Sequence, residues 1–274
     1  MKLILEEFRQ ERRTLCGDLP ERVRRTGPLV HLLTNYVTVT DCVNGVLAIG
    51  GRAICSHAPQ EAAQVTAGAD ALVCNLGATE YYDAMELSAA QALSAGIPFV
   101  IDPVGCAASA FRLNMCMHLT TNFHPAAIRG NYAELAVVTG CTGDAAGYAG
   151  SRGLDGGSTL STGEHDQLKD HMMAFASRHD TILIASGGVD LITDGVRMIE
   201  NPRGTAKMRQ ITGTGCMSGG ILAAFLSCDP SLDSAACAVR FVSLAGEAAQ
   251  ACCENTGTGA GHFHMFLMDA LSKE

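Results

Sequence analysis

The stretch PFVIDP at residues 98–103 decides the fold, because it is a short apolar run that ends in a polar turn. It lacks the two-residue alternation of apolar and polar side chains, which is typical of a strand covered on both faces. Asp102 and Pro103 are turn formers. We therefore expect a buried strand that ends at Asp102.

Similar apolar runs occur on both sides of this stretch, at residues 28–33, 53–56, 71–76, 126–130 and 181–186. Helical patterns separate them, and several of these patterns end in glycine, a common helix stop. They lie at residues 38–49, 59–68, 83–96, 132–140 and 165–179. Regular alternation of strand and helix predicts an α/β fold: a mostly parallel central sheet with helices on both faces and ligands beyond the carboxyl ends of the strands.

The later part of the chain differs from this alternation. Residues 190–195 and 196–200 predict two strands around an Asp-Gly turn, which is a hairpin at a sheet edge. Three helical stretches follow, at residues 216–227, 231–253 and 262–272. Residues 140–164 are rich in Gly, Ser, Thr and Asp, so we expect a long flexible loop there.

Composition excludes several classes of protein. The chain has 274 residues, of which 47% are hydrophobic and 17% charged, and this fits a single domain over residues 1–274. A net charge of −9 argues against nucleic-acid binding, which needs a cationic surface. Residues 1–13 read as an amphipathic helix without the apolar core of a signal peptide, and no run is long enough to span a membrane. We expect a cytoplasmic protein.

The 12 cysteines do not indicate a disulfide scaffold, because the chain is long and carries no export signal. We expect reduced thiols, most of them small buried residues. The nearest candidate for a metal site is Cys252 and Cys253 with His262 and His264. Adjacent cysteines point to different sides of a helix, so this interpretation is disfavoured.

ITGTGCMSGG at residues 211–220 is the strongest local motif. Gly213, Thr214 and Gly215 precede a helix, so backbone N–H groups and the positive end of the helix dipole converge there on an anion. The motif is neither a Walker loop, which needs Gly-Lys before Ser or Thr, nor a dinucleotide fingerprint. It predicts a phosphate cradle; the alternative is a glycine-rich start to a closely packed helix.

Polar residues follow the ends of the predicted strands. Each has an ordinary structural explanation taken singly, but all lie at carboxyl ends, where ligands bind parallel sheets. They are His31, Thr34, Asn35, Asn75, Gly77, Asp102, Gly105, Arg129, Gly130, Asn131, Ser186, Gly187 and Gly188.

Taken in order, several motifs resemble those of the hydroxyethylthiazole kinase family over roughly residues 28–270. They are HLLTN at 31–35, NGVLAIGG at 44–51, NLGA at 75–78, DPVG at 102–105, IRGNYAEL at 128–135, GGVDLITDG at 187–195 and TGTGCMSGG at 212–220. The resemblance implies a ribokinase-like fold and transfer of the γ-phosphoryl group of ATP to the hydroxyl of 4-methyl-5-(2-hydroxyethyl)thiazole, a thiamine salvage step. It also implies a homotrimer with active sites at subunit interfaces.

The resemblance further implies roles for individual residues. Cys216 matches the catalytic cysteine beside the accepting hydroxyl. The substrate-binding candidates are Cys55, Gly213 and Asn35; the ATP-binding candidates are Arg129, Ser186, Thr214, Gly215 and Asn131; the Mg²⁺ candidates are Asp102 and Glu134. A cation, a divalent metal and a set of backbone amides fit phosphoryl transfer, which depends on positioning and charge stabilisation.

The chain departs from the family pattern at three places, one of which is an expanded loop at residues 140–164. RAIC at 52–55 stands where the family has SPxM, so Cys55 replaces a substrate-contacting methionine, and GAGHF at 259–263 replaces GPGxF. A smaller side chain enlarges a pocket and shifts apolar discrimination. Two alternatives therefore stay open: a kinase of another small heterocyclic alcohol, or a non-catalytic nucleotide- or thiazole-binding protein.

Cys216 itself could be a nucleophile, a base, a metal ligand or a small core residue. A helix N-terminus lowers a thiol pKa, so Cys216 could exist partly as thiolate. That would suit a covalent nucleophile, with His31 or another histidine as its base. In a kinase, a weak or merely orienting base suffices because the transition state is loose. The orienting role predicts that aspartate at position 216 retains or raises activity and that alanine lowers it; a covalent role predicts that aspartate is inactive.

Overall fold

The computed structural model describes residues 2–141 and 162–272, which form a single eight-stranded sheet. The strand order is β2-β1-β3-β4-β5-β6-β7-β8, in which β1 to β6 are parallel and the β7–β8 hairpin is antiparallel at one edge. The strands are β1 (Leu29–Leu33), β2 (Arg52–Ile54), β3 (Ala71–Asn75), β4 (Phe99–Asp102), β5 (Ala127–Asn131), β6 (Ile182–Ser186), β7 (Asp190–Thr193) and β8 (Met198–Asn201).

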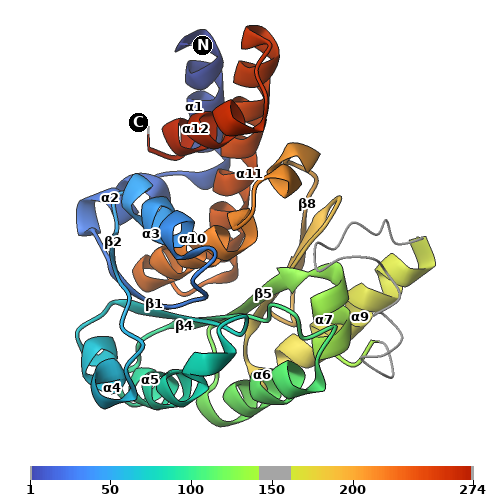
Figure 1. Cartoon of the computed structure of the whole chain (residues 1–274). Helices are drawn as coiled ribbons and strands as arrows, with labels where there is room; N and C mark the ends of the chain where they lie inside the picture. Colours follow the sequence, from blue (N-terminus) through green and yellow to red (C-terminus); the bar gives the residue numbers. More distant parts are fainter. Residues whose placement is uncertain (1, 142–161, 273–274) are drawn as a thin grey trace.

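Helices cover both faces of the sheet, as the sequence predicts (Figure 1). One face carries α2 (Leu19–Thr26), α3 (Val39–Ala48), α10 (Thr214–Cys228) and α11 (Leu232–Thr256). The other carries α4 (Pro59–Ala67), α5 (Tyr82–Ala95), α6 (Ala110–Phe123), α7 (Tyr132–Val138) and α9 (Thr162–His179). Two short 3₁₀ turns are η1 (Thr79–Tyr81) and η2 (Ala206–Gln210). Helices α1 (Lys2–Cys16) and α12 (Ala260–Ser272) pack on α11, outside these layers.

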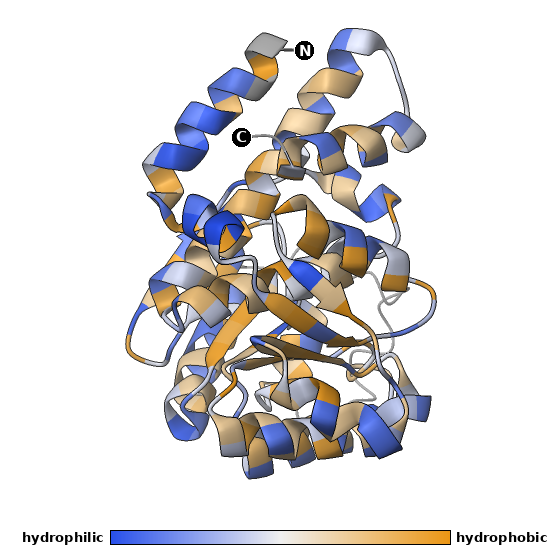
Figure 2. Ribbon diagram, turned by 90° about the vertical axis from the view of Figure 1, so that its left-hand side faces the viewer, coloured by the Kyte–Doolittle hydropathy of each residue, from blue (hydrophilic) through white to orange (hydrophobic). Residues whose placement is uncertain are grey.

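The core lies on both sides of the sheet, which explains the lack of alternation in the strands. All five residues of β3 are buried. Val73 belongs to the cluster under α10, whereas Leu72 and Cys74 belong to the cluster under α5. Figure 2 shows the central strands as a continuous hydrophobic layer. Because helices cover both faces, residues on both sides of such a strand are apolar up to its carboxyl end.

The predicted strands and hairpin lie within about two residues of their observed positions. Two helices, α2 and α6, were not predicted. Helix α6 has apolar residues at every second position, including Phe111, Leu113 and Met115, and this spacing does not form a helical stripe. Of the predicted loop at 140–164, residues 142–161 lie outside the described residues, and Thr162 already begins α9.

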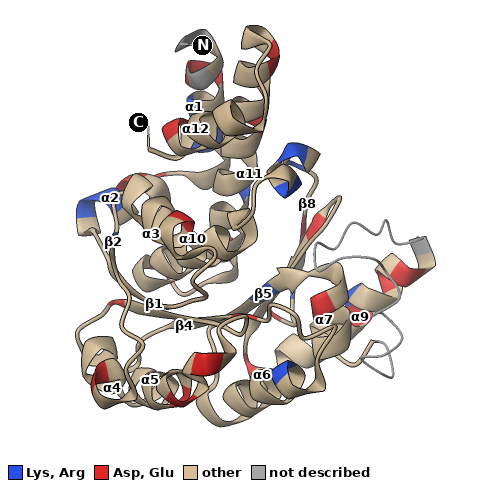
Figure 3. Cartoon of the chain, viewed as in Figure 1, with Lys and Arg blue, Asp and Glu red and all other residues tan. Residues whose placement is uncertain are grey.

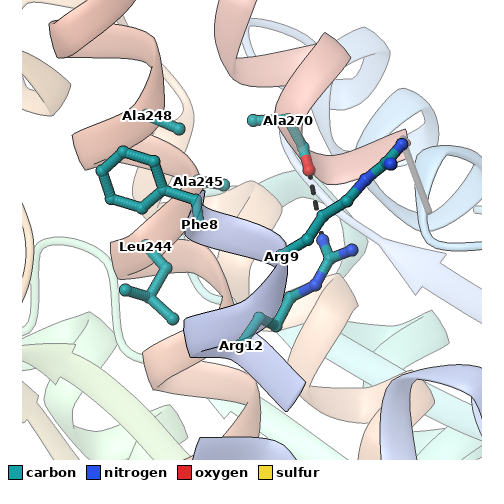
Figure 4. A pocket seen from close by; sticks show the side chains of 7 residues that line it. All are labelled: Phe8, Arg9, Arg12, Leu244, Ala245, Ala248 and Ala270. Atoms are coloured by element: carbon teal, nitrogen blue, oxygen red, sulfur yellow. Dashed lines mark hydrogen bonds between the residues drawn. The ribbon is translucent and has the colours of Figure 1, made fainter. Parts of the chain in front are cut away.

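The N-terminal helix α1 packs against α11 and the end of α12, and a small pocket lies in this contact (Figure 4). Arg12 donates from Nη1 to the carbonyl of Ala270 over 3.3 Å, and its guanidinium lies 4.7 Å from the ring centroid of Phe241. The pocket is lined by Phe8, Arg9, Arg12, Leu244, Ala245, Ala248 and Ala270. It therefore belongs to helix packing, and none of the predicted site residues lines it.

Figure 3 shows lysine and arginine positions on separate elements of the chain, such as α2, α6 and β5. The chain as a whole carries a net charge of −9. Among the helices that the structure describes, none combines the length and the apolar character needed to cross a membrane.

Candidate functional site at the carboxyl rim of the sheet

The carboxyl ends of the parallel strands bring the predicted polar residues to one rim. Pairing of β3 with β4 places Asn75 opposite Asp102, and pairing of β5 with β6 places Asn131 opposite Ser186. Neighbouring strands lie about 4.8 Å apart, so these side chains are neighbours although they are distant in sequence. Helix α10 begins at the same rim, because Gly215 contacts Arg129 of β5.

The glycine-rich turn is closely packed at its start. Gly213 has φ 90°, a left-handed conformation, and a Cβ there would lie 3.1 Å from the Thr38 side chain and 3.3 Å from Asp41 Oδ2. Position 213 therefore requires glycine. Gly215 lies next to a cation, because Arg129 donates from Nη1 to the Gly215 carbonyl over 2.9 Å. The turn thus combines the helix N-terminus with a guanidinium, as an anion site needs.

A buried amide connects Cys216 to the sheet. Asn75 donates from Nδ2 to Cys216 Sγ over 3.0 Å and to Asp102 Oδ2 over 2.6 Å. Its Oδ1 accepts from Asn35 Nδ2 over 3.3 Å. The sequence placed Asn75 at a strand end without giving it a role; the β3–β4 register, which sets it beside Asp102, was the missing information.

The expectation that Cys216 is partly thiolate is wrong. Burial of the thiol is the largest cause that raises the pKa of Cys216, and the neighbouring Asp102 carboxylate raises it further. The thiol is therefore protonated at neutral pH. His31 is not placed to act as its base, because it is fully buried with Nδ1 2.9 Å from Thr66 Oγ1 and Nε2 3.0 Å from the Ser56 carbonyl oxygen.

Two buried carboxyl groups lie at this rim. Burial raises the pKa of Asp102, and Arg129 opposes this rise. Burial and the charge of Asp102 raise the pKa of Glu134 to about 7. Glu134 accepts backbone N–H groups of Gly105 over 3.0 Å and of Asn131 over 2.9 Å. Asn131 Oδ1 in turn accepts the N–H of Glu134 over 2.9 Å, so the two residues form a capping box that starts α7.

This acidic pair fits Mg²⁺, since both groups are hard oxygen donors whose burial disfavours their charged forms until a cation neutralises them. Within the described residues no cluster of three His, Cys, Asp or Glu is arranged to hold a metal, so waters or phosphate oxygens would complete the octahedron. The Cys252 and Cys253 candidate is also not formed: both cysteines are buried in α11, and His264 bonds Asp41 over 2.8 Å.

The other predicted site residues are described by the contacts that their side chains make. Ser186 donates to the carbonyl of Gly130 over 3.0 Å, on the β5–β6 side. The Thr214 hydroxyl donates to the Met208 carbonyl over 3.1 Å, so its side chain faces η2. Cys55 packs against the cluster under α10, and burial raises the pKa of its thiol. Thr38, which the sequence did not single out for the site, donates to Asn35 Oδ1 over 3.2 Å.

Comparison with known proteins supports the sequence resemblance. The hydroxyethylthiazole kinase family model matches residues 21–273. A hydroxyethylthiazole kinase of Methanobrevibacter smithii is 35% identical over 260 residues, which cover 93% of this chain and 91% of that protein. The structure of a hydroxyethylthiazole kinase protein from Pyrococcus horikoshii OT3 has a TM-score of 0.79 at 27% identity, covering 99% of this chain and 93% of that one.

A more distant solved structure shows the wider fold. A ribokinase-like superfamily protein from Enterococcus faecalis V583 has a TM-score of 0.56 at 12% identity, with 93% of this chain and 90% of that chain covered. Together with the parallel sheet, this likeness confirms the predicted ribokinase-like α/β fold.

Proposed function

Because the chain belongs to the hydroxyethylthiazole kinase family, we propose that it transfers the γ-phosphoryl group of ATP to the hydroxyl of 4-methyl-5-(2-hydroxyethyl)thiazole. This is a step of thiamine salvage. The observation that carries the proposal is the convergence of Cys216, Asp102 and Arg129 at the start of α10. One end of this site presents a hydrogen-bonding group to an alcohol, and the other presents positive charge to a phosphate.

At the acceptor end, the neutral Cys216 thiol orients the alcohol. Phosphoryl transfer passes through a loose transition state, so the hydroxyl proton need not leave before the phosphorus–oxygen bond forms. A protonated thiol held by Asn75 can place that hydroxyl without removing its proton first. Gly213, Asn35 and Cys55 are the proposed contacts of the substrate around it.

At the phosphate end, the backbone amides after Gly213 and the guanidinium of Arg129 bind the transferring group. These donors are fixed before the reaction, because Arg129 is held by the Gly215 carbonyl and the turn is held by α3. Fixed dipoles stabilise the charge of a transition state without reorganisation. Asn131, Ser186 and Thr214 are the further proposed ATP contacts, Thr214 through its backbone because its hydroxyl is engaged by Met208.

Asp102 and Glu134 are the residues that would hold Mg²⁺. The bound ion would supply positive charge to the phosphate oxygens of ATP. The protein's own contribution is to fix both carboxylates in place: Asn75 holds Asp102, and two backbone N–H groups hold Glu134.

A coupled assay of ADP formation with ATP, Mg²⁺ and hydroxyethylthiazole tests the proposed function. Alcohol-dependent ADP release supports it. Turnover with a different heterocyclic alcohol in place of hydroxyethylthiazole would support the alternative that Cys55 suggests. Thermal stabilisation by both ligands without product would support a binding protein that has lost turnover.

Substitutions of Cys216 test its role. We expect Cys216→Asp to retain activity, because a carboxylate still accepts a hydrogen bond from the substrate hydroxyl. Cys216→Ala removes the orienting group and should lower kcat by about 100-fold, the lower end of the range for a lost acid–base group. Steady-state kinetics with saturating ATP measure both. An inactive aspartate variant, together with covalent labelling of Cys216 by an alkylating substrate analogue, would instead establish a covalent mechanism.

We further propose that the protein is a homotrimer with the active site at the subunit interface. Large apolar side chains are exposed next to site residues: Tyr36 and Val37 follow Asn35, at 79% and 61% exposure, and Ile54 precedes Cys55. Exposed apolar residues grouped in this way are typical of an interface.

The substitution Val37→Asp tests this assembly. A charge at a buried interface position should release monomers and lower activity, while the far-UV circular dichroism stays unchanged because the side chain is exposed within one subunit. Size-exclusion chromatography with light scattering measures the mass. Val196→Asp, at an 81% exposed position in the β7–β8 turn, is the matched control and should stay trimeric. A wild-type monomer would contradict the proposal.

A further inference from the structure

Asn75 has every polar position of its amide engaged. Its two N–H groups go to Cys216 and Asp102, and its oxygen accepts from Asn35 and from the Gly77 N–H, the latter over 2.9 Å. The side chain is buried, with 1% exposure. A carboxylate can only accept and a backbone N–H can only donate, so a single orientation of the amide satisfies Asp102 and Gly77 together.

The thiol is also contacted by Thr38, the residue that precedes α3. Thr38 forms a hydrogen bond with Cys216 and donates to Asn35 Oδ1 over 3.2 Å. Asn35 donates to Asn75, and Asn75 donates to Cys216. Asn35, Thr38, Asn75 and Cys216 therefore close a ring of hydrogen bonds, which we call the thiol ring. Three elements of the chain contribute to it: the β1–α3 segment, β3 and α10.

We propose that Asn75 is a positioning residue of the phosphoryl acceptor site, because it ties the Cys216 thiol to the Asp102 carboxylate in one fixed arrangement. This inference rests on the proposed function. A cysteine side chain has three staggered χ1 positions, and the hydrogen bond from Asn75 favours the one that faces the sheet rim. The hydroxyl of an alcohol bound to that thiol is then held at a fixed position relative to the phosphate end of the site.

The loss of such positioning has a measurable effect on the reaction rate. A misplacement of about 1 Å at a reacting centre can cost about 100-fold in rate. Its signature is a fall in kcat much larger than any change in KM for ATP, because Asn75 contacts the thiol directly and reaches the proposed Mg²⁺ site only through Asp102.

The isosteric substitution Asn75→Asp tests the inference. Aspartate keeps an oxygen that accepts from Gly77 and Asn35, but it removes both donated bonds and faces Asp102 with a like charge. We expect kcat to fall about 100-fold, with a much smaller rise in KM for ATP because the new charge lies beside Asp102, a proposed Mg²⁺ ligand. Asn114→Asp, at an exposed position of α6, is the matched control and should behave as wild type.

A second variant keeps the test valid if Asn75→Asp does not fold. Thr38→Val removes the hydroxyl from the other side of the thiol ring without adding charge. We expect a fall in kcat of about 10-fold, the size of one lost hydrogen bond, with KM for ATP unchanged. Where both single variants fold, the double variant should lose less than the product of the two effects, because residues of one network are non-additive. Unchanged kcat in either single variant, or strict additivity, would overturn the inference.

Alkylation of Cys216 by iodoacetamide gives a readout that does not depend on turnover, with Cys228 of the same sample as internal reference. In the Asn75→Asp variant we expect slower labelling of Cys216, because the sulfur loses a donor that stabilises the thiolate. Faster labelling would indicate a loosened site and only a structural role for Asn75. If wild type shows no turnover with hydroxyethylthiazole, the proposed function fails, whereas the labelling result still decides the Asn75–Cys216 contact.

Discussion

Replacing Arg129 by alanine should lower kcat/KM for ATP by about 1,000-fold, the effect expected when a guanidinium that stabilises a transferring phosphoryl group is removed. Arg129 is placed for this by two observations. It donates to the Gly215 carbonyl at the start of α10, and its charge opposes the rise in the pKa of both Asp102 and Glu134. The alanine variant therefore loses a phosphate ligand and also a cation that balances the buried acids.

Arg129→Lys separates these two contributions. Lysine restores the charge but not the planar set of donors, so we expect activity between wild type and alanine. Arg197→Ala is the control, because Arg197 is exposed and pairs with Asp233 over 3.0 Å at the surface. Steady-state kinetics with varied ATP measure all three variants. An alanine variant with more than about a tenth of wild-type kcat/KM would contradict a role in phosphoryl transfer.

Gly195→Ala should have the largest effect on stability. Gly195 lies in the β7–β8 turn with φ 87°, and a Cβ there would lie 2.3 Å from the backbone N and 2.6 Å from the Cα of Ser177 in α9. A backbone atom cannot move aside as a side chain can. Conformational strain and overpacking together should cost about 3 kcal/mol, which corresponds to a fall in Tm of about 10 °C for a chain of this size.

Differential scanning calorimetry measures this change. Gly68→Ala is the matched control: Gly68 ends α4 with φ −95°, and its nearest neighbour for a Cβ is the Val65 carbonyl oxygen at 3.7 Å. We expect the Tm of this variant to stay close to wild type. A Gly195→Ala protein with wild-type Tm would show that the turn can move away from α9.

Much of the fold was predictable because its signals are local. The runs at 71–76 and 98–103 showed buried strands, and their polar ends indicated the rim at which Asp102 lies. Helix α6 was missed because its residues Phe111, Leu113 and Met115 follow no helical stripe; α5 and α7 pack beside it in the folded chain. Tertiary packing overrides a weak local pattern.

The candidate site was predicted only in part. Residue types and the glycine-rich turn indicated a phosphate cradle with Cys216 beside it, and the structure brings that turn to Arg129. The protonation of the thiol was predicted wrongly, since a helix N-terminus is visible in the sequence whereas burial and the approach of Asp102 are not. The hydroxyl of Thr214 likewise faces Met208, which no local pattern indicates.

The sequence by itself determined the sheet, the rim and the chemistry available there, because hydrophobic periodicity and turn residues act over a few positions. Only the tertiary structure decided which groups meet. Asn75 and Cys216 are 141 residues apart, and their contact depends on the strand register and on the packing of α10 against the sheet. The pKa of a buried group depends on such neighbours, so the role of Cys216 follows from the fold.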